Sequence, residues 1–215
     1  MIKATSNQAP KVAVDELAVP HPQQFEEDGK TVTDPHVFHN AQNGVQMAKV
    51  ISENLTKLEP NNAKLYTEST QKITGELTKI NIWIKSQIAT IPSPSRKLVT
   101  THDAFGYYSK AYGLPIEGAL QGVSTEEAPT ASRVSELVKV IKTAGVPTIF
   151  AEATINPKLI KAVAKEANVK VSDRELFGDG LGEKGTDGET YQKMLTANTH
   201  SIVQGLGGKY SPLQP

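Results

Sequence analysis

The chain has 215 residues, of which 38% are hydrophobic and 21% are charged, a mixture typical of a globular protein and not of a disordered one. Lysine and arginine together number 23, as do aspartate and glutamate, so the formal net charge is zero and gives no basic surface for nucleic acid or an anionic membrane. The absence of cysteine excludes disulfides, a cysteine zinc site and a thiol nucleophile, and the opening MIKATSNQAPKV lacks the apolar core of a signal peptide.

The first half of the chain predicts one strand, a loop and two helices. Residues 12–19, VAVDELAV, fit a short buried strand, and residues 20–35, rich in proline and polar residues, fit an exposed loop. A helix is expected from Asn40, a favourable N-cap residue, to a break at residues 59–62. A second, unusually long helix ends at Pro92 and Pro94 and is expected to brace two lobes. Its apolar residues recur every three or four positions: Ile73, Leu77, Ile80, Ile84, Ile88 and Ile91.

Strands and helices alternate in the second half. Short strands are expected at residues 97–100, 148–152 and 169–171. Between them, one helix ends at Gly145 and another begins with Asn156 and Pro157 as its N-cap and first residue. A last helix carries Tyr191, Leu195, Ile202 and Leu206 on one face. This alternation predicts an α/β fold with mostly parallel sheets flanked by helices.

Side chains that bind metals lie near the ends of the predicted strands, where parallel α/β sheets present their working loops. His102 follows the strand at 97–100, Glu152 ends the strand at 148–152, and Asp179 lies in the loop after the last strand. His36 belongs to the first half, just before a helix. Neutral imidazoles with a carboxylate form a ligand set for a divalent metal such as zinc, manganese or iron.

Each of these residues also fits a structural role. His36 could cap a helix or lie on the surface, and Asp179, between glycines, could form a turn. Glu152 could cap the following helix or orient a ligand from behind. The remaining histidines fit surface or helix-face positions: His21, His39 and His200.

Known catalytic motifs give little support for an enzyme. Residues 180–185, GLGEKG, spell GxGxxG, but a dinucleotide site needs a strand directly before the glycines and another strand with an acidic residue about 20 positions later. Only a helix and a tail follow here. The sequence has no GxSxG elbow and no HExxH motif. Hydrolysis by a metal-bound water stays open, with Glu152 as the candidate base.

Four stretches, in order, resemble the substrate-binding proteins of manganese, zinc and iron ABC transporters. They are DPHVF at residues 34–38, THDAFGYYSKAYGL at 101–114, IFAEATINPKLIKAVAKEANVKV at 149–171 and FGDGLGEKGTDGETYQKML at 177–195. The resemblance runs from about residue 12 to residue 208, with the long helix between the first two stretches.

The resemblance implies two α/β lobes joined by one long helix, with a metal held between them by two ligands from each lobe. His36 falls on the histidine of the family's DPHVW motif. His102 falls on a ligand position that is histidine in many zinc-type members and glutamate in many manganese-type members. Asp179 falls on the aspartate of the FxDS motif, although Gly180 replaces the serine. Glu152 matches an acidic residue that would support a ligand from behind.

The front of the chain departs from the family. Members begin with a signal peptide, often of the lipoprotein type, and a βα segment that supplies the first ligand histidine. The chain is expected to begin after that segment, so that His21 takes no ligand role and the amino-terminal lobe is incomplete. The resemblance assigns residues 1–61 to the remainder of that lobe, 62–92 to the linking helix and 93–215 to the carboxy-terminal α/β lobe.

The function implied by the resemblance is that of a metal receptor without catalytic activity. It would be a monomer, periplasmic or on the cell surface, that captures zinc or manganese as cargo and delivers it to the permease of an ABC transporter, with no nucleic-acid partner. Two alternatives stay open. One is a truncated family member acting as a surface adhesion or interaction protein without metal transport, and the other is the metal-dependent hydrolase.

Overall fold

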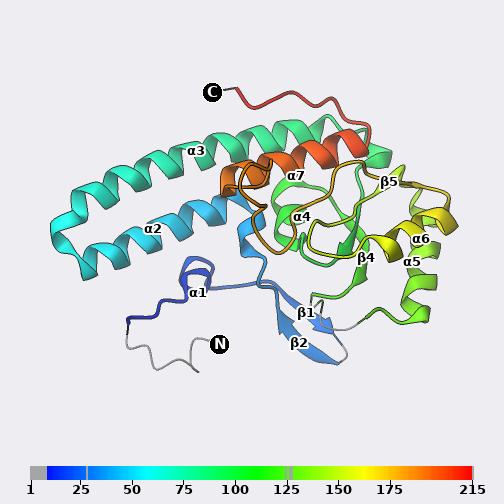
Figure 1. Ribbon diagram of the computed structural model, residues 1–215, viewed down its shortest axis with the longest axis horizontal. Helices are drawn as coiled ribbons and strands as arrows, with labels where there is room; N and C mark the ends of the chain where they lie inside the picture. The colour runs from blue at the N-terminus through cyan, green and yellow to red at the C-terminus, as the bar shows by residue number, and fades with distance from the viewer. Residues whose placement is uncertain (1–8, 28, 124, 126–127, 215) are drawn as a thin grey trace.

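Two long helices form a hairpin at one end of the molecule (Figure 1). The computed structural model describes residues 9–27, 29–123, 125 and 128–214. Helix α2 spans Ala41–Leu58 and α3 spans Ala63–Ala89, with the short 3₁₀ turn η3, Pro60–Asn62, between them. As predicted, Asn40 is the N-cap of α2, and its side chain accepts a hydrogen bond of 2.9 Å from the Gln42 backbone N–H. None of the described helices has the length and apolar character needed to cross a membrane.

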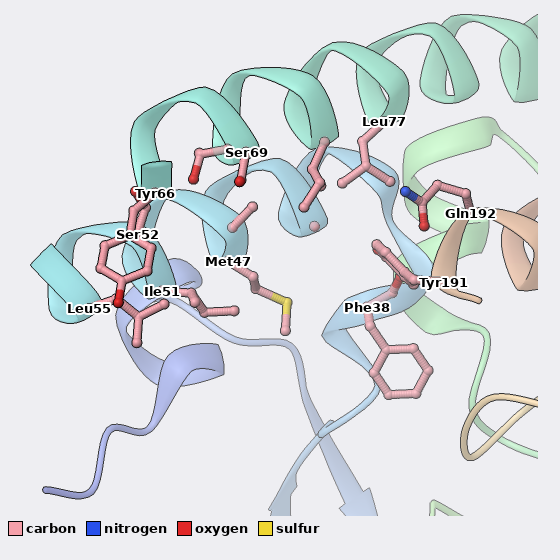
Figure 2. A pocket seen from close by; sticks show the side chains of 14 residues that line it. Phe38, Met47, Ile51, Ser52, Leu55, Tyr66, Ser69, Leu77, Tyr191 and Gln192 are labelled. Carbon is pink, nitrogen blue, oxygen red and sulfur yellow. The ribbon is translucent and has the colours of Figure 1, made fainter. Parts of the chain in front are cut away.

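The predicted apolar stripe of the long helix is buried over most of its length. Its buried members pack against the carboxy-terminal part of the chain, whereas Ile73, nearer the hairpin tip, remains 39% exposed. At that end, α2 and α3 enclose a groove of about 420 Å³ with mainly apolar walls (Figure 2). The labelled side chains that line the groove include Met47, Ile51, Leu55 and Leu77 of the two helices and, from other segments, Phe38 and Tyr191.

The first described segment differs from the sequence prediction. The strand expected at residues 12–19 is wrong, because Val14–Ala18 forms the short helix α1, whose glutamate, leucine and alanine favour a helix. The loop expected at residues 20–35 is also wrong, because β1, Gln24–Glu27, and β2, Lys30–Thr33, pair as an antiparallel hairpin. Gly29 in its turn has a φ of +72°, a conformation that glycine adopts without strain.

The carboxy-terminal part contains the parallel strands that the sequence predicts. Strand β3, Leu98–His102, pairs in parallel with β4, Ile116–Gln121, a strand that the sequence reading missed. Strand β5, Thr148–Ile149, pairs in parallel with β6, Lys170–Val171, and a further parallel bridge joins Glu152 to Leu176. A hydrogen bond of 3.0 Å from the Phe150 N–H to the Val99 carbonyl links the two pairs. The chain therefore runs as consecutive parallel strands whose carboxyl ends face the same way.

Successive residues of β3 and of the segment at β5 point to opposite faces, and each face has its own core. Leu98 and Phe150 join the core formed with α3, with α4, Gly106–Tyr112, and with α7, Tyr191–Gly205. Val99 and Ile149 join the core formed with α5, Ala131–Ala144, and α6, Lys158–Ala167. Helices thus cover both faces of the strands (Figure 1).

The helix ends follow the sequence signals closely. Helix α5 ends at Gly145, whose φ of +67° is the left-handed conformation predicted for it. Helix α6 begins one residue later than expected, at Lys158, and the Asn156 side chain accepts a hydrogen bond of 3.0 Å from the Lys158 backbone N–H. The long helix ends before the 3₁₀ turn η4, Ser93–Ser95.

Candidate metal centre

Three of the side chains singled out in the sequence meet in space, although they come from distant segments. One nitrogen from each of His36 and His102 and one oxygen of Asp179 all lie within 4.8 Å of one another. Asp179 Oδ1 lies 3.0 Å from His102 Nε2 and 3.4 Å from His36 Nε2. Among the described residues, this is the one cluster of at least three histidine and carboxylate side chains close enough to share an ion.

His36 is held by an aspartate that the sequence reading did not single out. The residue follows β2 and precedes the 3₁₀ turn η2, Val37–His39. Asp34 Oδ1 accepts a hydrogen bond of 2.9 Å from the His36 backbone N–H and lies 2.8 Å from its Nδ1. Both residues are buried. With Nδ1 directed at a carboxylate, Nε2 is the nitrogen that faces Asp179, which is the arrangement that carboxylate–histidine pairs adopt behind metals.

His102 is held in the same way by Glu152. His102 is the last residue of β3, and Glu152 lies at the end of the neighbouring strand segment. Glu152 Oε1 accepts a hydrogen bond of 2.8 Å from the His102 backbone N–H, and Oε2 lies 2.5 Å from His102 Nδ1. Burial acts to lower the pKa of His102, but the hydrogen bond and charge of Glu152, with the charge of Asp179, outweigh burial and raise it.

Asp179 is carried by a loop that lies directly against the His102–Glu152 pair. A Cβ atom on Gly178 would lie 2.2 Å from Glu152 Oε2 and 2.8 Å from His102 Cε1, so only glycine fits there. The preceding residue, Phe177, is held by Asn198 of α7. The Asn198 side chain accepts a hydrogen bond of 2.8 Å from the Phe177 N–H and donates one of 3.0 Å to the Phe177 carbonyl.

The other histidines divide between two environments. His21 is exposed, and His200 lies on α7 with its ring stacked on Tyr210 at a centroid distance of 3.8 Å, so both occupy the surface or helix-face positions predicted. The surface position predicted for His39 is wrong, because its side chain is completely buried, with Phe105 and the loop that carries Asp179 among its neighbours. Burial lowers its pKa to about 3, and its Nε2 lies 2.8 Å from the Gly178 carbonyl oxygen.

The chemistry of the cluster suits a divalent transition metal. Two imidazole Nε2 atoms and one carboxylate oxygen converge, and the histidine Nδ1 atoms are already engaged by Asp34 and Glu152. The Asp179 side chain is 39% exposed, which leaves an approach from solvent, while both histidine side chains are at most 5% exposed. Such a ligand set binds zinc well and also accepts manganese or iron.

Comparison with known proteins identifies the family. The sequence model of the zinc-uptake complex component A, periplasmic, or ZnuA, matches residues 1–205. The chain belongs to this family. The ZnuA family comprises binding components of transporters and not enzymes, and the family predicted from the four stretches is confirmed.

Curated relatives of the ZnuA family bind manganese or zinc according to their names. The chain is 32% identical over 173 residues to the manganese ABC transporter substrate-binding lipoprotein PsaA of Streptococcus pneumoniae, covering 80% of this chain and 55% of PsaA. It is 36% identical over 177 residues to the zinc-binding protein TroA of Treponema pallidum, covering 80% of this chain and 57% of TroA. The chain therefore spans little more than half the length of these relatives.

Solved structures confirm the α/β fold. The periplasmic zinc-binding protein TroA of Treponema pallidum matches with a TM-score of 0.87 and 33% identity, over 95% of this chain and 74% of that one. A laminin-binding adhesin, Lmb, of Streptococcus agalactiae matches with a TM-score of 0.76 and 27% identity, over 88% of this chain and 69% of that one.

Proposed function

We propose that the protein captures a divalent transition metal, zinc or manganese, outside the cytoplasmic membrane and delivers it to the permease of an ABC transporter. The observation that carries this proposal is the convergence of His36, His102 and Asp179 within 4.8 Å, with a buried carboxylate behind each histidine. The names of PsaA and TroA, a manganese transporter lipoprotein and a zinc-binding protein, support the choice of cargo.

Coordination is the mechanism of capture. The Nε2 atoms of His36 and His102 and a carboxylate oxygen of Asp179 bind the ion, and water completes its coordination. Asp34 and Glu152 keep the Nδ1 proton on each ring, so that the lone pair of Nε2 is presented to the metal. The two histidines and one carboxylate favour zinc by their softness, whereas the supply of metal decides whether manganese binds instead.

The ligands belong to different parts of the proposed division of the chain. His36 lies in the remainder of the amino-terminal lobe at residues 1–61, and His102 and Asp179 lie in the carboxy-terminal lobe at 93–215. The linking segment at 62–92 contains α3, whose buried side chains tie it to the carboxy-terminal core. We expect this stiff brace to limit the change on binding to small shifts of loops or lobes. A large change in radius of gyration between metal-free and metal-loaded protein would contradict this.

A calorimetric titration of metal-stripped protein with Zn²⁺ and Mn²⁺ tests the proposal. One metal ion per chain should bind, and His102→Ala should abolish or severely weaken binding. His200→Ala is the matched control, because this histidine is stacked on Tyr210 outside the cluster and should leave the affinity intact. Absence of binding by the unaltered chain, or equal losses in both variants, would refute the proposed function.

A surface-adhesion role is the second candidate, favoured by the similarity to the laminin-binding adhesin Lmb. Metal-free and metal-loaded protein passed over immobilised laminin, with albumin as the control surface, would test it. Saturable binding to laminin alone would support adhesion, and its absence in both forms would exclude this candidate.

A further inference from the structure

His39 is a buried histidine outside the proposed ligand set. Its ring stacks on Phe105, with centroids 4.4 Å apart and planes at 25°, and lies 4.6 Å from the ring of Phe38. Its Nε2 lies 2.8 Å from the carbonyl oxygen of Gly178, and its Nδ1 has no hydrogen-bond partner among the described residues. A carbonyl oxygen only accepts, so Nε2 carries a proton and is the donor in this hydrogen bond.

An imidazole is a costly choice for this position. Leaving Nδ1 buried without a donor is unfavourable, and an aromatic or aliphatic side chain between Phe38 and Phe105 would avoid that penalty. Packing therefore does not account for the residue. Among the described residues, the hydrogen bond that requires a donor on this side chain is the one to the Gly178 carbonyl.

Gly178 is the residue of the Asp179 loop that packs against His102 and Glu152. Its backbone lies so close to Glu152 and His102 that a Cβ atom would overlap both. Asn198 fixes the preceding peptide from the α7 side, and His39 fixes the Gly178 carbonyl from the side of the first segment. With both bonds in place, Asp179 Oδ1 reaches the Nε2 atoms of both proposed ligand histidines.

We infer that His39 is a positioning residue whose Nε2–H holds the Gly178 carbonyl and thereby sets where Asp179 meets the metal. The inference rests on the proposed function, because its effect is measured as metal affinity. It also links two segments that are far apart in the sequence, since His39 lies 139 residues before Gly178. The bond thus couples the segment that carries His36 to the loop that carries Asp179.

The experiment compares His39→Gln with His39→Met in Zn²⁺ titrations of metal-stripped protein. The two side chains have similar length, and only glutamine keeps a donor near the position of Nε2. We expect the methionine variant to bind at least about ten-fold more weakly, as is typical when a group behind a ligand is lost, and the glutamine variant to stay within about three-fold of the unaltered protein. Equal affinities in both variants would overturn the inference.

The same comparison in the Asp179→Ala variant distinguishes a positioning role of His39 from a general contribution to stability. If His39 acts through Asp179, then the His39→Met penalty should vanish in Asp179→Ala protein, because the positioned ligand is already gone. An undiminished penalty in that background would show a structural role and overturn the inference. Should the methionine variant fail to fold, His39→Phe, which keeps a flat ring, replaces it in both comparisons.

Metal titration of the unaltered protein distinguishes failure of this inference from failure of the proposed function. If metal-stripped protein with His39 intact binds no Zn²⁺, Mn²⁺ or Co²⁺, the proposed function fails and the inference fails with it. If the unaltered protein binds and His39→Met binds equally well, the receptor stands and only the positioning role is refuted. In Co²⁺-loaded protein, the visible absorption bands should shift in His39→Met and not in His39→Gln, which reports the ligand geometry directly.

Discussion

Replacing Glu152 by glutamine should weaken metal binding without removing a ligand. In the structure, Glu152 accepts a hydrogen bond from the His102 backbone N–H, its Oε2 lies 2.5 Å from His102 Nδ1, and the residue is only 1% exposed. Glutamine has a single oxygen, so one of the two contacts is lost and the amide NH₂ faces a ring N–H. A hydrogen bond to a charged group is worth about 1.5–3 kcal/mol, and about 1.4 kcal/mol is a factor of ten, so Kd should rise about ten-fold to a hundred-fold.

Competition calorimetry at pH 7 with a zinc chelator measures this change. Glu175→Gln is the matched control, since it makes the same chemical change at an exposed glutamate on the segment leading to the Asp179 loop. The control should bind like the unaltered protein. An affinity of Glu152→Gln within two-fold of the unaltered protein would refute the reasoning, because the orientation of His102 would then not depend on its carboxylate partner.

Three further changes follow from the same contacts. Asp34→Asn should weaken metal binding about ten-fold to a hundred-fold by freeing the His36 ring, while Asp173→Asn, at an exposed site, should not. Gly178→Ala should reduce affinity and lower the free energy of unfolding by about 1–3 kcal/mol, because its Cβ overlaps Glu152, whereas Gly180→Ala, with no described atom within 4 Å of its Cβ, should change neither. Burial lowers the pKa of His39 to about 3, against an ordinary value of 6.5. Below pH 6.5 the unfolded chain therefore binds a proton that the folded protein does not, and the free energy of unfolding decreases as the pH is lowered. Denaturant unfolding of metal-free protein should show about 2 kcal/mol lost between pH 7 and pH 5 that His39→Gln does not lose; equal losses would contradict the burial of a neutral ring.

The parts of the fold that the sequence predicts are those set by local signals. The stripe from Leu77 to Ile91, the cap at Asn40 and the left-handed Gly145 each follow from side-chain period or backbone freedom, and each is present. The hairpin at residues 24–33 was missed because proline and polar residues on both sides outweighed the turn signal of Gly29. Strand β4 was missed because Gly118, which packs against Leu137, interrupts its apolar pattern.

The candidate site shows a similar division. The rule that polar residues follow parallel strands, together with family resemblance, singled out His36, His102 and Asp179, and the structure brings them together. Contacts between distant segments could not be predicted. His39 reaches a carbonyl 139 residues away, which its position in the chain does not indicate. Asp34 lies only two residues before His36, but its contact with Nδ1 depends on how the His36 ring is turned in the fold.

A crystal structure of the zinc-loaded protein, with the ion located by anomalous scattering at the zinc edge, tests the central claim most directly. The account predicts one ion at roughly 2.0–2.2 Å from the Nε2 atoms of His36 and His102 and from a carboxylate oxygen of Asp179. It also predicts that Asp34 and Glu152 keep their contacts with the Nδ1 atoms. An ion bound elsewhere, or held without one of these three side chains, would contradict the account.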